Sequence, residues 1–286
     1  MSIDSQLRDD FTVLLAVYYR DEPNQFDRAL TSIFSNTLLP KSVLVVADGP
    51  LTDDLDEVLA SHAAYQQTLR IHRLPVNGGL SKALNEGLAL VDTEWVARAD
   101  ADDINHSDRF QKQARLLTMR GGAIDLMGGA ISEVDRVGRL LAVRHTPTSH
   151  DEIVRFASRR NPFNHMTVWY RTELARRVGG YPCIHLKEDY ALWAAMIKAG
   201  ARCANLDEPL VDALTGQEMY RRRGGLRYAV AEIELQRHLH MTGLKSRLLA
   251  CIDICSRSAV FLAPACVREM VYKKILRPKP LPVKSR

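Results

Sequence analysis

Three carboxylates stand almost side by side near the middle of the chain. Asp100, Asp102 and Asp103 follow the apolar run Trp95-Val96-Ala97, which predicts a buried strand. Carboxylates this close repel one another unless a cation or a proton lies between them. Mg²⁺ and Mn²⁺ prefer such oxygen ligands and often bridge to substrate phosphates. The cluster therefore points to divalent-metal chemistry, and the alternative is an acidic surface turn, in which aspartate is common.

Two other segments place polar groups where predicted strands end. Asp48 closes a second apolar run and precedes Gly49-Pro50, and Asn77-Gly78-Gly79 joins a third strand to a helix. Glycines let the backbone approach a ligand closely, and a helix N-terminus favours an anion. In a doubly wound sheet these strand ends face one crevice, where a carboxylate can accept hydrogen bonds from a base or a ribose. The alternatives are a plain β-turn at Asp48 and a tight turn at the glycines.

Two charged groups later in the chain also have both a functional and a structural interpretation. Glu188-Asp189 opens a predicted helix, where a carboxylate can remove a proton from an attacking hydroxyl or simply complement the helix dipole. Arg221, Arg222 and Arg223 form a compact cationic cluster before Gly224-Gly225. Guanidinium groups bind phosphates in a bidentate manner, and the alternative is a solvated run of charge.

The elements that must position these residues alternate between strand and helix in the first hundred residues. Apolar runs rich in β-branched residues predict the strands, and apolar residues at helical spacing predict the helices. The strands are expected at 11–17, 42–47, 68–74 and 94–99, and the helices at 24–34, 51–64 and 78–91. This alternation predicts a doubly wound parallel sheet with flanking helices.

The second half has a more mixed pattern. Strands are expected at 123–133 and 139–143, joined by a hairpin turn at 135–138, and at 165–170. Helices are expected at 107–119, 171–178, 188–198 and 218–240. Beyond residue 244, apolar and basic residues alternate in two helical pieces broken at Pro264, and the Pro-rich end, 277–286, is expected to be disordered.

Composition is that of an ordinary globular protein. The 286 residues are 46% hydrophobic and 26% charged, and the net charge is +5. The five scattered cysteines lack zinc-site spacing and predict reduced thiols in a cytosolic protein. We expect neither a secretory signal nor a transmembrane helix, because the start of the chain is polar and no apolar stretch is long enough. Ten basic residues and two acidic ones follow position 244, which favours an acidic partner such as a membrane or a nucleic acid.

Taken in order, the motifs resemble the inverting family 2 glycosyltransferases of the GT-A fold, and most closely the bacterial enzymes of exopolysaccharide and O-antigen assembly of the amylovoran type. The resemblance covers about residues 11–211. It is carried by an ordered set of segments: Val17-Tyr18 with Glu22, Asp48-Gly49, Asn77-Gly78-Gly79 through Asn85 and Gly87, Arg98 to Asp103, Gly179-Gly180-Tyr181, and Glu188-Asp189-Tyr190 with Trp193.

The resemblance implies a role for each matching residue. Asp48 would hold the nucleotide base, Asp100 the ribose side, Asp102 (with Asp100) a Mn²⁺ or Mg²⁺ ion on the donor diphosphate, and Asp189 would be the catalytic base. The other residues implied in nucleotide-sugar binding are Tyr18, Glu22, Asn77, Lys82, Arg98, Arg221, Arg222 and Arg223. Glu188 and Trp193 would lie on the acceptor side, although Trp193, like the other two tryptophans, also fits an apolar core pattern.

The chain also departs from the family pattern. Ala47 replaces the first of two aspartates that often precede the glycine, and the Gln-x-x-Arg-Trp motif of processive synthases is not matched at Gln217. These departures, with no flanking membrane helices, favour an enzyme that adds one sugar. A metal-dependent sugar nucleotidyltransferase is the alternative enzyme. A non-enzymatic module that binds nucleic acid or membrane would account for the basic residues after position 244. It would not account for the acidic motifs, so no nucleic-acid partner is expected.

The expected organisation follows from this resemblance. Residues 1–215 would form the GT-A catalytic domain, with a donor half at 11–105 and an acceptor half at 106–215. Residues 216–276 would form a helical segment that associates with an anionic membrane surface. The expected partners are a nucleotide-sugar donor, with a UDP-sugar as the first expectation, and a lipid-pyrophosphate-linked sugar acceptor. The expected location is the inner face of the cytoplasmic membrane, as a peripheral protein.

Overall fold

The computed structural model describes residues 11–215 and 224–263, and its donor half follows the predicted alternation. Its strands are β1 (Phe11–Val17), β2 (Ser42–Ala47), β3 (Leu69–Arg73) and β4 (Trp95–Arg98), and its helices are α2 (Pro23–Phe34), α3 (Asp53–Tyr65) and α4 (Leu80–Leu90). The four strands are parallel, in the order β3-β2-β1-β4. Because β1 and β2 are buried on both faces, they are almost wholly apolar, as is typical of parallel strands covered by helices.

The acceptor half extends the same sheet with strands of both directions. The short strand β5 (Ile104–Asn105) ends the donor half. The elements of the acceptor half are α5 (Arg109–Met119), β6 (Leu126–Val134), β7 (Leu140–Arg144), α6 (His150–Ala157), a 3₁₀ turn (His165–Thr167), β8 (Trp169–Arg171), α7 (Thr172–Arg177), α8 (Glu188–Lys198) and β9 (Cys203–Leu214). Within the described residues, nine strands form one sheet. β8 is antiparallel to β4 and β6, whereas β9 is parallel to β6. The sheet is therefore mixed overall, and the expectation of a mainly parallel sheet holds only for the donor half.

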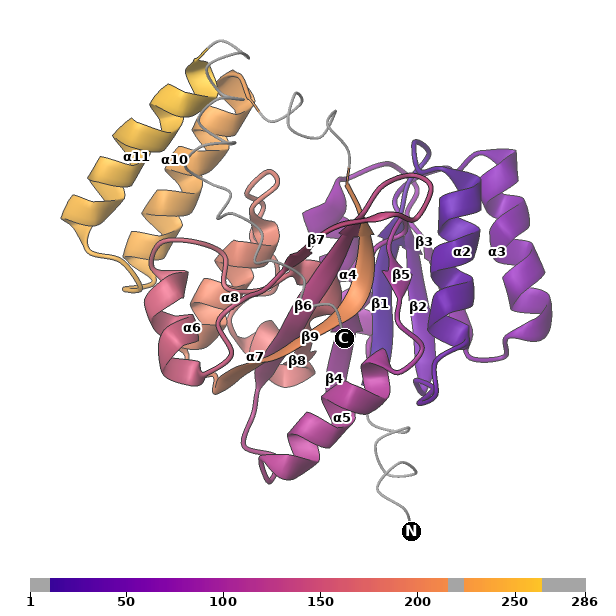
Figure 1. Cartoon of the computed structure of the whole chain (residues 1–286). Coiled ribbons are helices and arrows are strands. Elements are labelled where there is room, and N and C mark those ends of the chain that lie inside the picture. Colours follow the sequence, from indigo (N-terminus) through magenta and orange to yellow (C-terminus); the bar gives the residue numbers. More distant parts are fainter. Residues whose placement is uncertain (1–10, 216–223, 264–286) are drawn as a thin grey trace.

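Helices cover both faces of the sheet (Figure 1), and a hydrophobic layer lies under the helices on each face. Helices α2, α3 and α5 pack on one face, where Phe26, Leu55 and Phe110 contact side chains such as Val13 of β1. Helices α4, α6, α7 and α8 cover the other face. The three tryptophans, Trp95, Trp169 and Trp193, are all in the core, as their apolar surroundings in the sequence predicted.

A short clasp joins the donor half to the acceptor half on this second face. Asn85 of α4 donates a hydrogen bond to the carbonyl of Tyr181 and accepts one from its backbone N–H, each at 2.8 Å. Gly180, just before, has a φ of +71°, and a Cβ there would lie 2.3 Å from Oδ1 of Asn85. Only glycine fits this approach, which explains the Gly179-Gly180-Tyr181 motif in physical terms.

Two elements of the acceptor half, β9 and α6, were not predicted from the sequence, and neither was the two-residue strand β5. In β9, Asp207, Glu208 and Pro209 interrupt the apolar pattern, and there the register with β6 shifts. Proline and charge are tolerated in a strand at such irregularities, but they hide the strand from pattern reasoning. Helix α6 has only eight residues, yet its capping box of Ser149 and Glu152 is a sequence signal that was available.

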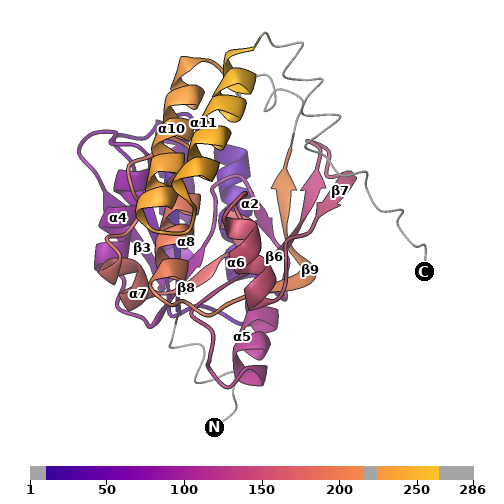
Figure 2. The same cartoon turned by 90° about the vertical axis from the view of Figure 1, so that its left-hand side faces the viewer.

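The C-terminal part contains two helices that lie side by side beyond α8 (Figures 1 and 2). They are α10 (Leu226–Met241) and α11 (Arg247–Leu262). α10 packs on α8 through Leu235 and Leu239, and α11 packs on α10. The expected helix at 218–240 begins at Leu226 in the structure, and residues 216–223 and 264–286 lie outside the described range, as do the predicted break at Pro264 and the Pro-rich tail. None of the helices seen in 11–215 and 224–263 combines the length and apolar character needed to span a bilayer.

Candidate active site

The predicted donor-binding carboxylates lie at one edge of the sheet, past the carboxyl ends of parallel strands. Val17 of β1 pairs with Ala47 of β2, and Leu14 pairs with Arg98 of β4. Asp48 and Asp100 therefore leave adjacent strands on either side of β1, at the position where open α/β sheets bind ligands.

Asp48 is buried and organises the glycine loop that precedes α4. Its two carboxylate oxygens accept hydrogen bonds from the N–H groups of Gly78, at 2.7 Å, and Gly79, at 2.9 Å. The Asn77 side chain donates to the Asp48 carbonyl at 3.0 Å. Gly49 has a φ of +87°, and a Cβ there would lie 2.6 Å from the Asn77 nitrogen. The glycines thus allow the two strand ends to approach each other, and the base-binding role of Asp48 stays a prediction.

Asp100 is held between two cationic groups. The buried Arg98 guanidinium forms an ion pair with one carboxylate oxygen, and His165 Nε2 lies 2.8 Å from the other. Burial alone would raise the pKa of Asp100, but the charges of Arg98 and His165 outweigh it and hold that pKa well below its usual range. Arg98 Nη1 is also buried, and it has no hydrogen-bond partner among the described residues.

His165 connects Asp100 to Asp189, the predicted catalytic base. The second ring nitrogen, Nδ1, lies 3.4 Å from Asp189 Oδ2, which also accepts a hydrogen bond from Asn161 at 2.8 Å. Although burial opposes the charge of the imidazole, Asp100 and Asp189 raise the pKa of His165 to about 10. Burial would raise the pKa of Asp189, but the hydrogen bond from His165 and its charge lower it, so the carboxylate is ionised at neutral pH.

The other carboxyl groups at this edge, those of Asp102, Asp103 and Asp21, have raised pKa values. The Asp102 side chain reaches solvent, but it also has many protein atoms around it. The loss of water around the carboxyl, together with the charge of Asp100, raises the pKa of Asp102. Asp103 is buried, accepts a hydrogen bond from Leu214 N–H at 3.3 Å, and has its pKa raised further by burial and by Asp102. Burial, with the charges of Asp102 and Asp100, raises the pKa of Asp21 to about 7. The edge therefore carries more negative charge than its own cations neutralise.

This donor set fits a hard divalent ion. The residues that the structure describes contain no group of three or more His, Cys, Asp or Glu side chains arranged as a complete cage. Mg²⁺ is commonly held by only one or two carboxylates together with substrate phosphates. Asp102, exposed and next to Asp100, offers such oxygens where the negative charge is least compensated. Asp100 can contribute through the oxygens that Arg98 and His165 also contact.

A buried arginine fixes the turn that carries these carboxylates. The Arg109 side chain, on the first turn of α5, donates to the Arg98 carbonyl at 2.7 Å, to Gln113 Oε1 at 3.2 Å and to Asn105 Oδ1. Burial lowers its pKa to about 9. A guanidinium with several acceptors in a fixed geometry restrains the backbone on both sides of residues 99–104.

Three further residues predicted to bind the nucleotide sugar are Tyr18, Lys82 and Glu22. Tyr18 is exposed at the end of β1, and Lys82 is exposed on α4 with its aliphatic part over Gly78. Glu22 caps α2 by accepting from Gln25 N–H at 2.9 Å, which gives it a structural role whether or not it also meets a ligand.

Glu188, which was predicted to lie on the acceptor side, is in the first turn of α8, beside Asp189. It is buried, and burial together with Asp189 raises its pKa. Trp193 is fully buried against Phe163, Tyr170 and Tyr181, so its place is in the core behind the site and direct contact with an acceptor is not expected. Arg221, Arg222 and Arg223 lie outside the described residues.

Sequence reasoning missed three residues that the structure brings to the site: Asp21, Asn161 and His165. His165 was placed at the start of a strand, but it lies in a 3₁₀ turn before β8. The polar stretch of Asn161, Asn164 and His165, directly before an apolar strand, was a usable signal. Asp21 stands between two residues that had been singled out, Tyr18 and Glu22, and its side chain accepts from the Tyr18 N–H at 2.9 Å.

Comparison with known proteins assigns the family. The profile of Glycosyl transferase family 2 matches residues 12–173. The UDP-Gal:alpha-D-GlcNAc-diphosphoundecaprenol beta-1,3-galactosyltransferase of Escherichia coli is 35% identical, over 93% of this chain and 96% of the relative. The amylovoran biosynthesis glycosyltransferase AmsE of Erwinia amylovora is 33% identical, over 92% and 98%. The chain therefore belongs to glycosyltransferase family 2, which confirms the resemblance and excludes the nucleotidyltransferase alternative.

Solved structures confirm the GT-A fold at low sequence identity. The mannosyltransferase PcManGT of Pyrobaculum calidifontis, in complex with GDP-Man and Mn²⁺, has a TM-score of 0.60 at 17% identity and covers 95% of this chain and 81% of its own. TarS 1–349 of S. aureus, in complex with UDP-GlcNAc, also has a TM-score of 0.60, at 19% identity, with 80% and 66% covered.

Proposed function

We propose that this family 2 glycosyltransferase transfers one galactose from UDP-galactose to a sugar linked to a lipid through a diphosphate, with inversion at the anomeric carbon. The name of the Escherichia coli relative specifies this donor and an N-acetylglucosamine diphosphoundecaprenol acceptor, and the two chains are 35% identical over nearly their whole lengths. The observation that carries the proposal is the bridge from Asp100 through His165 to Asp189. It supports a site in which the predicted base lies next to the donor-binding carboxylate.

Asp189 acts as the general base in the proposed reaction. Its ionised carboxylate accepts the proton of the acceptor hydroxyl while the hydroxyl oxygen bonds to the anomeric carbon of the donor. The bond from that carbon to the diphosphate breaks on the opposite side, and UDP leaves with the electron pair. The hydrogen bonds from Asn161 and His165 orient the carboxylate so that one oxygen can face the acceptor.

The donor half binds the nucleotide and stabilises the leaving group. In this proposal Asp48 contacts the nucleotide base, and Tyr18 and Asp100 contact the nucleoside. The unpaired Nη1 of Arg98 is available to donate to an oxygen of the sugar nucleotide. Asp102, with Asp100, would hold Mn²⁺ or Mg²⁺, which neutralises the growing negative charge of the diphosphate. The neighbour with GDP-Man and Mn²⁺ has the same fold, which supports a metal for this chain.

The proposal is tested by incubating the protein with UDP-galactose, UDP-N-acetylglucosamine or GDP-mannose and a synthetic N-acetylglucosamine diphospholipid, with Mn²⁺ or Mg²⁺. We expect a product heavier by one hexose with UDP-galactose, release of UDP, and a β-linkage by NMR. Product from another sugar nucleotide and none from UDP-galactose would overturn the donor assignment. A retained anomeric configuration would overturn the role of Asp189.

We also propose that α11 holds the enzyme on an anionic membrane surface, where a lipid-linked acceptor resides. Leu248, Leu249 and Ile252 are 71%, 46% and 53% exposed, and Arg247 is exposed beside them. Apolar residues flanked by basic ones are typical of a helix that lies in the membrane interface, where each basic residue adds about 1 kcal/mol. Deleting everything from Leu244 would be a poor test, because the buried Lys245 holds Gln236 of α10 at 2.7 Å.

A double substitution, Leu248→Glu with Leu249→Glu, is a sharper test of this membrane role. We expect it to reduce sedimentation with anionic vesicles and to leave turnover of a short, water-soluble acceptor unchanged. Met119→Glu on α5 is the control, since Met119 is 82% exposed at a distant part of the molecule. Equal sedimentation of the double variant and the wild type would place membrane binding elsewhere.

A further inference from the structure

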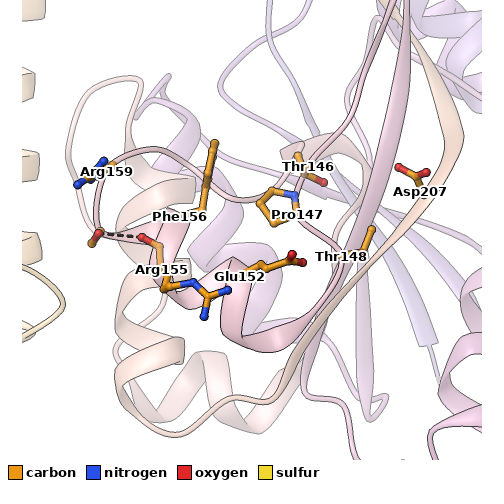
Figure 3. A pocket seen from close by; sticks show the side chains of 9 residues that line it. Thr146, Pro147, Thr148, Glu152, Arg155, Phe156, Arg159 and Asp207 are labelled. Carbon is orange, nitrogen blue, oxygen red and sulfur yellow. Dashed lines mark hydrogen bonds between the residues drawn. The ribbon is translucent and has the colours of Figure 1, made fainter. Parts of the chain in front are cut away.

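A pocket of about 900 Å³ opens beside α6, outside the site described above (Figure 3). Its walls are α6 with the turn that follows it, the segment of Thr146, Pro147 and Thr148 after β7, and Asp207 of β9. Arg155 and Arg159 bring two guanidinium groups to its lining, and Phe156 an aromatic ring.

The two arginines are available to an anion, whereas the acids of the pocket have partners of their own. Among the described residues, neither guanidinium has a hydrogen bond or an ion pair within 4 Å. Glu152 Oε2 accepts from the Ser149 hydroxyl at 2.6 Å, and Asp207 Oδ1 lies 2.8 Å from His145 Nδ1. The hydrogen bonds from Ser149 lower the pKa of Glu152, and the charge of Arg155 contributes to this shift. Two guanidiniums in one lining, neither held in an ion pair by the part of the chain that the structure describes, favour a phosphate-bearing ligand.

The turn after α6, which forms one wall of the pocket, lies between the catalytic base and α11. Two residues after Arg159, Asn161 donates its hydrogen bond to Asp189. The hydroxyl of Tyr190, next to the base, donates to the carbonyl of Ala157 at the end of α6. On the other side, Arg257 of α11 donates to the carbonyl of Arg159. The turn that carries Arg159 is therefore fixed to α8 and to α11 at once.

We infer that this pocket binds the diphosphate of the acceptor, with Arg155 and Arg159 as its ligands. The inference rests on the proposed function, in which the acceptor consists of a sugar, a diphosphate and a lipid in that order. The protein presents Asp189, the arginine pocket and the exposed apolar face of α11 in the same order. One extended acceptor can thus place its hydroxyl at the base while its lipid follows α11 toward the membrane.

The test compares two acceptors on the full chain: N-acetylglucosamine diphospholipid, and the same sugar as an alkyl glycoside without phosphate. Arg155→Ala with Arg159→Ala should lower kcat/KM for the diphospholipid by about 30-fold or more, mainly through KM, since charge-assisted hydrogen bonds to two guanidiniums are lost. The value for the alkyl glycoside and the KM for UDP-galactose should not change. Arg155→Lys with Arg159→Lys should fall in between, because lysine keeps the charge and loses the fork.

A matched control removes two arginines of α5 instead, Arg115→Ala with Arg120→Ala, both exposed and away from the pocket. It should behave as the wild type. Methylenediphosphonate, titrated by calorimetry in EDTA without donor, should bind the wild type and not the Arg155 and Arg159 double alanine variant.

The possible outcomes separate this inference from the proposed function. Equal kcat/KM of wild type and double alanine variant on the diphospholipid would overturn the pocket assignment and leave the glycosyl transfer standing. If the wild type uses no diphospholipid acceptor at all, the proposed function fails. The diphosphonate titration then decides the pocket by itself, and equal binding by the two proteins would overturn it.

Discussion

The donor half and the acceptor half hold their functional groups in different ways. In the donor half, Asp48 and Asp100 follow directly from the carboxyl ends of parallel strands. In the acceptor half, Asn161 comes from a loop, His165 from a 3₁₀ turn and Asp189 from the first turn of α8. The proposed donor site is therefore part of the sheet, whereas the proposed acceptor site is assembled from connections that pack on it.

This difference suggests why one half would bind the donor and the other the acceptor. A nucleotide diphosphate is common to many donors, and a rigid strand edge suits a constant ligand. Acceptors vary, and loops can change without altering the core. The two halves meet at His165, where a residue of the acceptor half contacts carboxylates of both. Substitutions on either side of that contact should therefore separate donor binding from transfer.

The largest effect is expected from Asp189→Asn, which removes the base and keeps the size of the side chain. Transfer should fall by about a thousandfold, within the range for general-base catalysis, while the affinity for UDP measured by calorimetry stays the same. Glu188→Gln is the control in the neighbouring position and should cost far less. A variant that retains near wild-type transfer would make Asp189 only a residue of the first helical turn.

The next effect, on the donor side, is expected from Asp102→Asn. Loss of a strong electrostatic stabiliser should reduce kcat by at least about a hundredfold, and metal activation should require more Mn²⁺. Removing divalent ions with EDTA should abolish turnover of the wild type, and added Mn²⁺ should restore it. Full activity in EDTA would show that the carboxylates of this turn act without a metal.

A smaller effect is expected at the contact between the halves. His165→Gln keeps a hydrogen-bond donor and removes the charge that lowers the pKa of both Asp100 and Asp189. Both pKa values should rise, so the acid limb of the kcat profile should move to higher pH, with kcat down about tenfold at neutral pH. His106→Gln makes the same substitution at a histidine that contacts Asp212, 2.7 Å away, and should leave the profile unchanged. An unshifted acid limb in His165→Gln would contradict the coupling.

The smallest effect is one on stability, at Asp21. Its pKa is raised from 3.8 to about 7, so between these values the folded chain holds a proton that the unfolded chain releases. Wild-type stability should therefore fall as the pH rises through this window. Asp21→Asn removes that loss, so the advantage of this variant in Tm should grow from about pH 4 to about pH 7 and then level off. Equal Tm values at pH 8, without metal or donor, would contradict the raised pKa.

The same division between halves explains what the sequence could predict. Strands β1, β2 and β4 are continuous apolar runs that end in polar residues, so both the elements and the positions of Asp48 and Asp100 followed from local pattern. β9 was missed because its charged and proline residues lie at a register shift, where the partner strand and not the local pattern determines the strand. His165 and Asn161 were missed because a turn brings them to Asp189 from more than twenty residues away. Local pattern left Glu188-Asp189 open between a general base and a partner of the helix dipole, and the family motif selected Asp189.

The clasp between Asn85 and Tyr181 has a consequence for building hybrid enzymes. Exchanging acceptor halves among relatives is a natural route to new sugar linkages, and a crossover anywhere between α4 and Gly180 separates the two sides of this clasp. A foreign half that carries any side chain at the Gly180 position would press a Cβ to 2.3 Å from Asn85 Oδ1. A foreign α4 without an amide at position 85 would leave the Tyr181 backbone without its partner. A hybrid enzyme should therefore take α4 and the acceptor half from the same parent, although α4 lies in the donor half of the chain.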